Sequence, residues 1–336
     1  MAFTSLARVG LLAVACALSL ACSDGAAPDM PASTAGNGGS SGSNAAGASS
    51  AGTLASSAGA NSGGNAAGGV SQGGAAGMSG GTFAGAGMGG VGGMIDPNGG
   101  APAGPASGRH TPKPIGTMPG TTAGYWEYLP PHYGNGALYP LLIFRHGSGE
   151  SGNGTTDLQK VLVHGPPKLI EADQWPEARS FVVLSVQHPA GSCSTPQESD
   201  DFIKFALDSY DVDPKRVYIT GLSCGAIAGW NYLGDHTDEA VAAAVLICGD
   251  GRPAFTKAGC NLGKVPIWAF HGEADPTVDP KGSIDTVASL KACTNPAAVD
   301  VKLTTYPGVP HDSWTMTYDL SNPANDIYAW LMTHTK

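Results

Sequence analysis

The apolar positions between about residue 125 and the C-terminus fall into short runs that alternate between two periods. Runs rich in β-branched and aromatic residues predict strands over residues 125–129, 138–145, 181–187, 217–220, 242–248, 265–270 and 299–306. Stretches with helical spacing predict helices over residues 158–170, 199–210, 226–233, 282–293 and 325–334. This alternation indicates an α/β fold, in which helices cover both faces of a mostly parallel sheet.

The N-terminal third has a different pattern and predicts export. Residues 1–21 hold one charge, Arg8, followed by an apolar run that is too short to cross a bilayer. The run ends Leu-Ser-Leu-Ala-Cys, which is similar to a bacterial lipoprotein signal with Cys22 as the lipid-bearing residue. Ordinary secretory cleavage is the alternative, and either route exports the protein.

Residues 22–111 are almost wholly small or polar, and they predict a disordered linker. Such a composition has too little apolar surface to offset the entropy lost on ordering. Residues 112–336 then form one domain of ordinary size.

The charge of the chain limits its partners. The formal net charge is −10, and no basic stripe is present, so nucleic acid is not expected as a partner. We expect contact with a membrane only through the N-terminal lipid, and we expect a monomer.

One strand runs directly into a motif that predicts a nucleophile. Residues 217–225 read Val-Tyr-Ile-Thr-Gly-Leu-Ser-Cys-Gly, and an apolar helix is expected from residue 226. A strand, a tight Gly-x-Ser-x-Gly turn and a helix form a nucleophile elbow, so Ser223 is the candidate nucleophile. The same pattern occurs at Ser40, Ser71 and Ser79, but there it lacks a strand before it and a helix after it.

Two other strand ends supply the partners that a serine nucleophile needs. Asp275 follows the strand at residues 265–270, and His311 follows the strand at residues 299–306. A histidine removes the hydroxyl proton, and a carboxylate orients the histidine. The chain order serine, aspartate, histidine is that of α/β-hydrolases. Asp279 and Asp312 are the competing candidates for the acid.

An oxyanion hole requires N–H donors close to the nucleophile. The backbone N–H groups of Cys224 and Ser148 are the candidates, because Ser148 lies in the glycine-rich loop after residues 138–145. His146 in this loop is expected to bind neighbouring backbone rather than to act as a base. No metal-ligand spacing is present, and no cofactor is expected.

Five motifs along the chain resemble one family. They are His146-Gly-x-Gly-Glu, His164-Gly-Pro-Pro-Lys, the segment from Asp211 to Ser223, His271-Gly-x-x-Asp-x-x-Val and His311-Asp-x-Trp. Together they are similar to secreted α/β-hydrolase esterases grouped with polyhydroxybutyrate depolymerases, feruloyl esterases and acetylxylan esterases. The resemblance implies the α/β-hydrolase fold, the nucleophile, acid and base named above, and the two oxyanion donors.

The border of the substrate site is less well defined by the sequence. Gln187, His188 and Trp314 lie on loops at strand ends, so we expect them to line the substrate pocket. Trp314 has an alternative role as a buried cover for His311. No large lid insertion is visible between residues 248 and 265, which predicts an open cleft suited to bulky or polymeric esters.

These features predict a serine hydrolase that cleaves carboxylic esters through an acyl-enzyme. A serine peptidase is the alternative enzyme, because amide and ester hydrolysis share this machinery. A catalytically silent surface-binding module on the same fold is the alternative from another class.

The exported domain contains five cysteines, so at least one is unpaired within it. Oxidising surroundings favour disulfides. We expect a Cys260–Cys293 disulfide, because both residues flank the strand at 265–270 and its following helix. A Cys193–Cys224 disulfide would then leave Cys248 free and buried.

Overall fold

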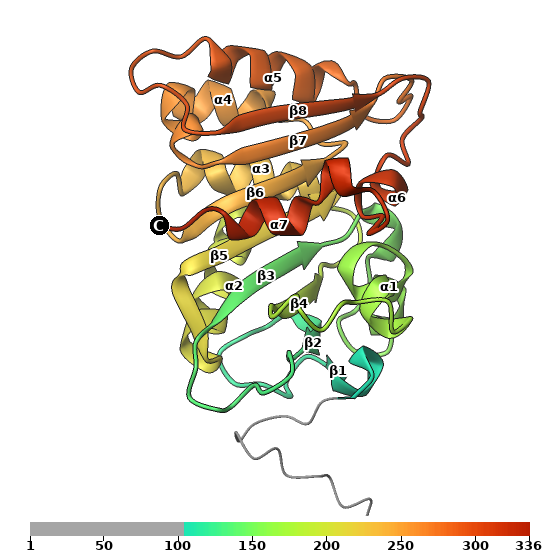
Figure 1. Ribbon diagram of the computed structural model, residues 1–336. Coiled ribbons are helices and arrows are strands. Elements are labelled where there is room, and N and C mark those ends of the chain that lie inside the picture. The colour runs from blue at the N-terminus through green and yellow to red at the C-terminus, as the bar shows by residue number, and fades with distance from the viewer. Residues whose placement is uncertain (1–103) are drawn as a thin grey trace, which may run out of the picture. The chain divides into compact units, whose positions relative to one another are not determined.

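The computed structural model describes residues 104–336. The predicted signal peptide, lipidation at Cys22 and most of the predicted linker lie outside the described residues. The described chain forms an eight-stranded sheet with the order β1-β2-β4-β3-β5-β6-β7-β8 (Figure 1). The strands are β1 (His110–Lys113), β2 (Gly124–Tyr128), β3 (Tyr139–Arg145), β4 (Val182–Gln187), β5 (Val212–Leu222), β6 (Val241–Ile247), β7 (Ile267–Gly272) and β8 (Val301–Tyr306).

Only β2 among these strands runs against its neighbours. It pairs antiparallel with β1 and β4, whereas β4, β3, β5, β6, β7 and β8 are parallel along the sheet. The carboxyl ends of the parallel strands therefore meet at one edge of the sheet, where active sites of such folds form. This arrangement confirms the predicted α/β-hydrolase fold.

Helices cover both faces of the sheet (Figure 1). The α-helices are α1 (Gly165–Glu171), α2 (Pro196–Ser209), α3 (Cys224–Asp235), α4 (Arg252–Ala258), α5 (Lys281–Lys291), α6 (Trp314–Thr317) and α7 (Ile327–Met332). The 3-10 helices are η1 (Ala106–Arg109), η2 (Ser148–Glu150), η3 (Leu158–Val163), η4 (Gly259–Lys264) and η5 (Pro323–Asn325).

The core consists of two hydrophobic layers, one on each face. Leu141 and Ile143 of β3 belong to the layer that packs on α2 and α3, whereas Leu142 and Phe144 belong to the layer on α1 and α7. Successive strand side chains point to opposite faces, so a strand buried on both sides is apolar at every position.

The domain begins earlier than the composition indicated. β1 starts at His110, and η1 precedes it, whereas the sequence predicted linker up to residue 111. β1 reads His-Thr-Pro-Lys, a short polar segment at the edge of the sheet, where proline is tolerated. An edge strand of this kind carries no alternating apolar pattern, which is why the sequence missed it.

The expected helix over residues 158–170 is interrupted. It is divided into η3 and α1, with Gly165 at a φ of +64° between them. A side chain at Gly165 would lie 2.5 Å from the Phe144 ring, and the two following prolines can begin a helix but not continue one.

The segment between β6 and β7 forms no lid. It folds into α4 and η4, and α4 packs against α3 and α5 on one face of the sheet. The sequence analysis had no helix in this segment. Within residues 104–336, no helix has the length and apolar character needed to cross a membrane.

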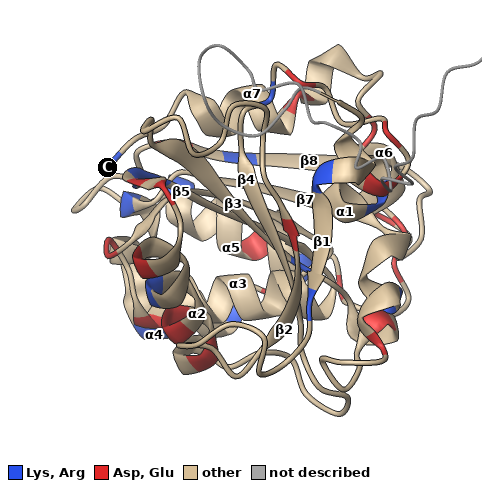
Figure 2. Cartoon of the chain, turned by 90° about the horizontal axis from the view of Figure 1, so that it is seen from below, with Lys and Arg blue, Asp and Glu red and all other residues tan. Residues whose placement is uncertain are grey.

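Both disulfides that the sequence favoured are present. Cys193 is bonded to Cys224, Cys260 is bonded to Cys293, and the remaining cysteine of the domain, Cys248, is free and buried. Acidic side chains gather on α2, as Figure 2 shows, and include Glu198, Asp200, Asp201 and Asp208.

Candidate active site

Ser223 occupies the sharp turn between β5 and α3. Its φ of 51° and ψ of −118° are unusual for a residue with a side chain. The turn is compact, because a Cβ on Gly221 would lie 2.8 Å from the carbonyl of Gly225, and one on Gly225 would overlap the Arg145 carbonyl. The Ser223 N–H donates to Ile247 O at 2.9 Å and fixes the turn against β6. The two glycines therefore permit the nucleophile elbow that the sequence predicted.

Ser223, His311 and Asp275 are brought together by three different loops. His311 Nε2 lies 2.9 Å from Ser223 Oγ, and His311 Nδ1 lies 2.7 Å from Asp275 Oδ2. With an ionised carboxylate, Nδ1–H donates to Asp275, which leaves Nε2 to accept the proton of the Ser223 hydroxyl. The Asp275 side chain is fully buried, and the His311 side chain is 20% exposed. Bulk water therefore reaches the histidine but not the acid.

Asp275 is held in its ionised form. Burial would raise its pKa, but hydrogen bonds from His311 and from the Val278 and Thr277 N–H groups outweigh burial and hold the pKa below its usual range. The two N–H groups lie 3.0 and 2.8 Å from Oδ1, so each carboxylate oxygen has its own partners. This arrangement keeps a negative charge next to His311 at neutral pH.

His271 supports the acid, a role that the sequence analysis did not assign. Burial lowers the pKa of His271, and its Nε2 lies 3.2 Å from Asp275 Oδ2 and 3.1 Å from Val278 O. Its Nδ1 lies 2.8 Å from Ser283 Oγ, whose hydroxyl donates to Gly249 O at 3.0 Å. The i, i+4 spacing of His271 and Asp275 in the quoted motif is the signal that could have indicated this contact.

The competing acids have other partners. Asp279 is half exposed, lies 3.2 Å from an Arg252 nitrogen and accepts from the Lys281 N–H. Asp312 accepts from the Thr315 N–H and hydroxyl at the start of α6. The His311 ring contacts neither carboxylate within hydrogen-bonding distance among the described residues.

The predicted oxyanion donors belong to two segments that adjoin Ser223. Cys224 begins α3, and Ser148 begins η2 directly after Gly147. A Cβ on Gly147 would lie 3.6 Å from the Ser223 Cβ, so this loop runs alongside the nucleophile. The disulfide to Cys193 ties the Cys224 side of the site to the segment that precedes α2.

His146 binds backbone, as the sequence predicted. Its Nδ1 lies 2.6 Å from Gly147 O, and its Nε2 accepts from the His188 N–H at 3.1 Å. Burial lowers the pKa of His146 to about 3, so the ring is neutral. The two imidazole rings stack at 4.0 Å. His146 therefore connects the ends of β3 and β4.

Gln187, which the sequence predicted at the substrate pocket, is hydrogen bonded to the neighbouring loop. Its side-chain nitrogen donates to Glu150 O and Asp157 O at 3.0 and 2.8 Å, and its oxygen accepts from the Gly154 N–H at 2.9 Å. All polar atoms of this buried side chain thus hold the loop after η2. His188 lies beside it, and Nε2 of His188 is buried without a partner among the described residues.

Trp314 packs against His311, the candidate general base. Its ring is perpendicular to the His311 ring at 5.3 Å and also contacts His164 at 5.3 Å. His164 in turn lies 3.7 Å from the carboxylate of Glu150, a buried acid whose pKa burial raises. The half-buried Trp314 covers His311, which is the alternative role that the sequence left open for this residue.

Two groups of side chains in the described part of the chain have the proximity that a metal ion requires. Cys248, Asp275 and His311 form one, but its aspartate and histidine are committed to the hydrogen bonds described above. The second group is Asp200, His236 and Glu239, in which Asp200 already pairs with Lys204 at 2.6 Å.

Comparisons with known proteins agree with this fold. The family model described as the dienelactone hydrolase family matches residues 176–332, the part that contains Ser223, Asp275 and His311. A solved structure described as a thermostable esterase is 25% identical, with a TM-score of 0.52. The match covers 69% of this chain and 64% of that chain, so this chain spans less than two thirds of that esterase.

Two further solved structures match this chain with lower TM-scores. The feruloyl esterase module from Clostridium thermocellum complexed with sinapinate is 16% identical and matches with a TM-score of 0.45, over 60% of this chain and 82% of that chain. Porphyromonas gingivalis dipeptidyl peptidase 4 is 15% identical and matches with a TM-score of 0.47, over 67% of this chain and 35% of that chain. No curated protein matches this chain. The chain therefore has the α/β-hydrolase fold, and its residues 176–332 are similar to the dienelactone hydrolase family.

Proposed function

We propose that the domain is a serine hydrolase that cleaves carboxylic esters, with Ser223 as nucleophile, His311 as general base and Asp275 as the orienting acid. The hydrogen-bonded series from Asp275 through His311 to Ser223, on a nucleophile elbow, carries this proposal. The match to a family of hydrolases and the likeness to an esterase support it.

The geometry gives each residue a step. His311 Nε2 takes the Ser223 hydroxyl proton as Oγ attacks the ester carbonyl, and Asp275 stabilises the imidazolium that forms. The N–H groups of Cys224 and Ser148 would donate to the negatively charged oxygen of the tetrahedral intermediate. His311 then gives its proton to the leaving alcohol, and the acyl group remains on Ser223. Water, deprotonated by His311, releases the carboxylic acid and restores the serine.

The test is a Ser223→Ala variant assayed on p-nitrophenyl esters, feruloylated and acetylated xylan, polyhydroxybutyrate and a chromogenic peptide. Loss of the nucleophile should lower kcat by about 10⁴-fold or more without unfolding the domain. Ser321→Ala, at an exposed serine in a C-terminal turn, is the matched control and should retain full activity.

A second readout separates the nucleophile from a merely structural serine. An organophosphonate inhibitor should attach to the peptide that contains Ser223, as mass spectrometry would show. Activity within tenfold of the wild type in Ser223→Ala, or labelling at another serine, would disprove the assignment. Turnover of the peptide but of no ester would favour a peptidase.

We also propose that the protein is exported and anchored by lipid on Cys22, on the strength of the lipoprotein-like signal in residues 1–22. Cys22→Ser should move the protein from the membrane fraction to the soluble exported fraction, and intact mass should lose the lipid increment. Unchanged fractionation would instead favour ordinary secretion.

A further inference from the structure

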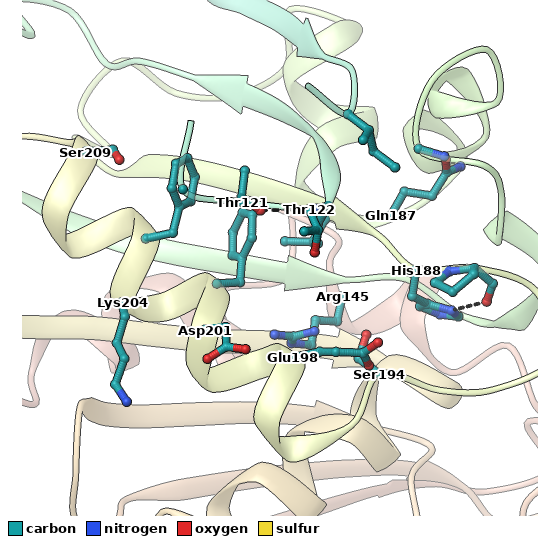
Figure 3. A pocket seen from close by; sticks show the side chains of 18 of the residues that line it. Thr121, Thr122, Arg145, Gln187, His188, Ser194, Glu198, Asp201, Lys204 and Ser209 are labelled. Atoms are coloured by element: carbon teal, nitrogen blue, oxygen red, sulfur yellow. Dashed lines mark hydrogen bonds between the residues drawn. The ribbon is translucent and has the colours of Figure 1, made fainter. Parts of the chain in front are cut away.

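A cavity of about 780 Å³ lies beside the candidate active site but does not contain it. Its lining comes from the chain before β2, the ends of β3 and β4, and α2, and it includes neither Ser223, Asp275 nor His311 (Figure 3). Phe202, Phe205 and Ile115 supply apolar walls. The volume is within the range of small-molecule sites.

The distinctive feature of this cavity is a buried cation. Arg145 is the last residue of β3, and only 3% of its surface is exposed. Its Nη2 is buried and has no hydrogen-bond partner among the described residues. Burial lowers the pKa of Arg145 to about 10, which leaves the guanidinium charged at neutral pH. A buried, charged donor without an acceptor is unusual in a folded protein.

No ion pair joins this cation to a carboxylate of the described residues, although the charge of Glu198 partly offsets the effect of burial on the Arg145 pKa. In Figure 3, Arg145 lies among Glu198, Asp201 and Ser194. Glu198 Oε2 instead accepts from the N–H and hydroxyl of Thr195, at 2.7 and 3.0 Å, as the capping box of α2. The guanidinium therefore keeps one donor, Nη2, for which the described residues supply no acceptor.

The rest of the lining is rich in hydrogen-bond acceptors. Asp201, Asp208 and Glu198 stand at an exposed rim, and Ser194 and Thr122 add hydroxyl groups. His188 also lines the cavity, and its buried Nε2 lacks a donor; its Nδ1 donates to Pro189 O at 3.0 Å, so Nε2 is an acceptor. A ligand must therefore offer O–H or N–H donors in addition to an anion.

From these features we propose that the cavity is a second binding site, for a carboxylate that carries several hydroxyl groups, of the sugar-acid class. The carboxylate would accept from the Arg145 guanidinium, and the hydroxyl groups would donate to His188 and the acidic rim. The three rim carboxylates, which Lys204 at the same rim only partly offsets, repel a dianion such as phosphate more strongly than a monocarboxylate. A simple hydrocarbon acid would leave the acceptors without donors.

The backbone that lines this second site is in contact with the nucleophile elbow at Ser223. The Arg145 carbonyl packs against Gly225 and Gly221, and Ser194 follows Cys193, which is bonded to Cys224. The proposal does not depend on ester hydrolysis, because binding is measured with ligands that contain no ester.

Isothermal titration calorimetry of the full-length protein with D-glucuronate tests the site, with D-glucose, acetate and inorganic phosphate as comparisons. We expect glucuronate to bind at least tenfold more tightly than each of the three. If glucose bound with the same affinity as glucuronate, the cation would not contribute to binding. If acetate or phosphate bound with the same affinity, the hydroxyl groups would not contribute. Either result would overturn the proposal.

Variants localise the binding to the cavity. Arg145→Gln should weaken glucuronate binding at least tenfold. Because Arg145 is buried, a second variant, Thr122→Trp, fills the cavity from an exposed position and should cause a similar loss. Thr256→Trp, at an exposed threonine on α4, is the matched control and should bind normally. Unchanged affinity in Thr122→Trp would place any binding elsewhere and overturn the site.

Discussion

At the scale of single residues, the acid of the candidate triad is selected by its contacts. Asp275 and Asp279 are four residues apart in one loop, but only Asp275 is buried and hydrogen bonded to His311. Asp279 faces solvent beside Arg252. Proximity in sequence therefore does not distinguish them, whereas burial and direction do.

This difference predicts unequal effects of the same substitution. Asp275→Asn should reduce kcat by about 10⁴-fold, because an amide no longer enforces the Nδ1–H tautomer of His311 or stabilises the imidazolium. Asp279→Asn is the matched control and should change kcat less than threefold. Steady-state kinetics on a p-nitrophenyl ester measures both variants, and a larger loss at Asp279 would transfer the role of acid to that residue.

The pKa of Asp275 also has a consequence for stability. Because its folded pKa lies below the usual value of 3.8, ionised Asp275 stabilises the fold above that pH. That contribution declines as the pH falls through the folded pKa. The unfolding free energy of Asp275→Asn should therefore fall less between neutral and acid pH than that of the wild type.

At the scale of elements, the β5–α3 elbow is joined to the segment before α2 by the Cys193–Cys224 disulfide. Cys260–Cys293 joins η4, before β7, to the end of α5. The sequence separations are 31 and 33 residues, so the two bonds restrict the unfolded chain almost equally. Loop entropy gives about 3–4 kcal/mol for each.

The two bonds should therefore affect stability alike but activity differently. Cys260→Ser and Cys193→Ser should each lower the unfolding free energy by about 3 kcal/mol, as measured by urea denaturation. Only Cys193→Ser should also lower kcat, because Cys224 is the proposed oxyanion donor. Equal kcat in the two variants would show that the elbow does not need its disulfide.

At the scale of the whole molecule, the sheet edge shows where the domain begins. β1 pairs with β2 along its full length, and His110 is buried with its Nδ1 3.1 Å from the Glu171 carboxylate. Removing β1 would expose one edge of β2 and the aromatic surface beside it, including Trp126.

Truncations test this boundary. A chain that starts at Gly104 should keep the melting temperature of the full-length protein. One that starts at Pro114 lacks η1 and β1 and should melt several degrees lower, as measured by circular dichroism. Identical melting temperatures would show that the domain does not need η1 and β1 for its stability.

Much of this molecule follows from local sequence. Continuous apolar runs predicted the parallel strands, because a strand buried on both faces needs apolar residues at every position. Stretches with helical spacing predicted the main helices. Glycines around Ser223 determined the elbow, because only a residue without Cβ permits the close backbone contacts at Gly221 and Gly225. Chain order at the strand ends placed Ser223, Asp275 and His311 at one edge of the sheet.

Other features depended on contacts between segments far apart in sequence. Gln187 has the position of a pocket residue, but the loop at Glu150–Asp157 uses all its polar atoms. The break at Gly165 follows from its contact with Phe144, and the strand at His110 exists only by pairing with β2. The burial of Arg145 without a partner is likewise a property of packing, because a charged residue in an otherwise apolar strand does not reveal which groups will surround it.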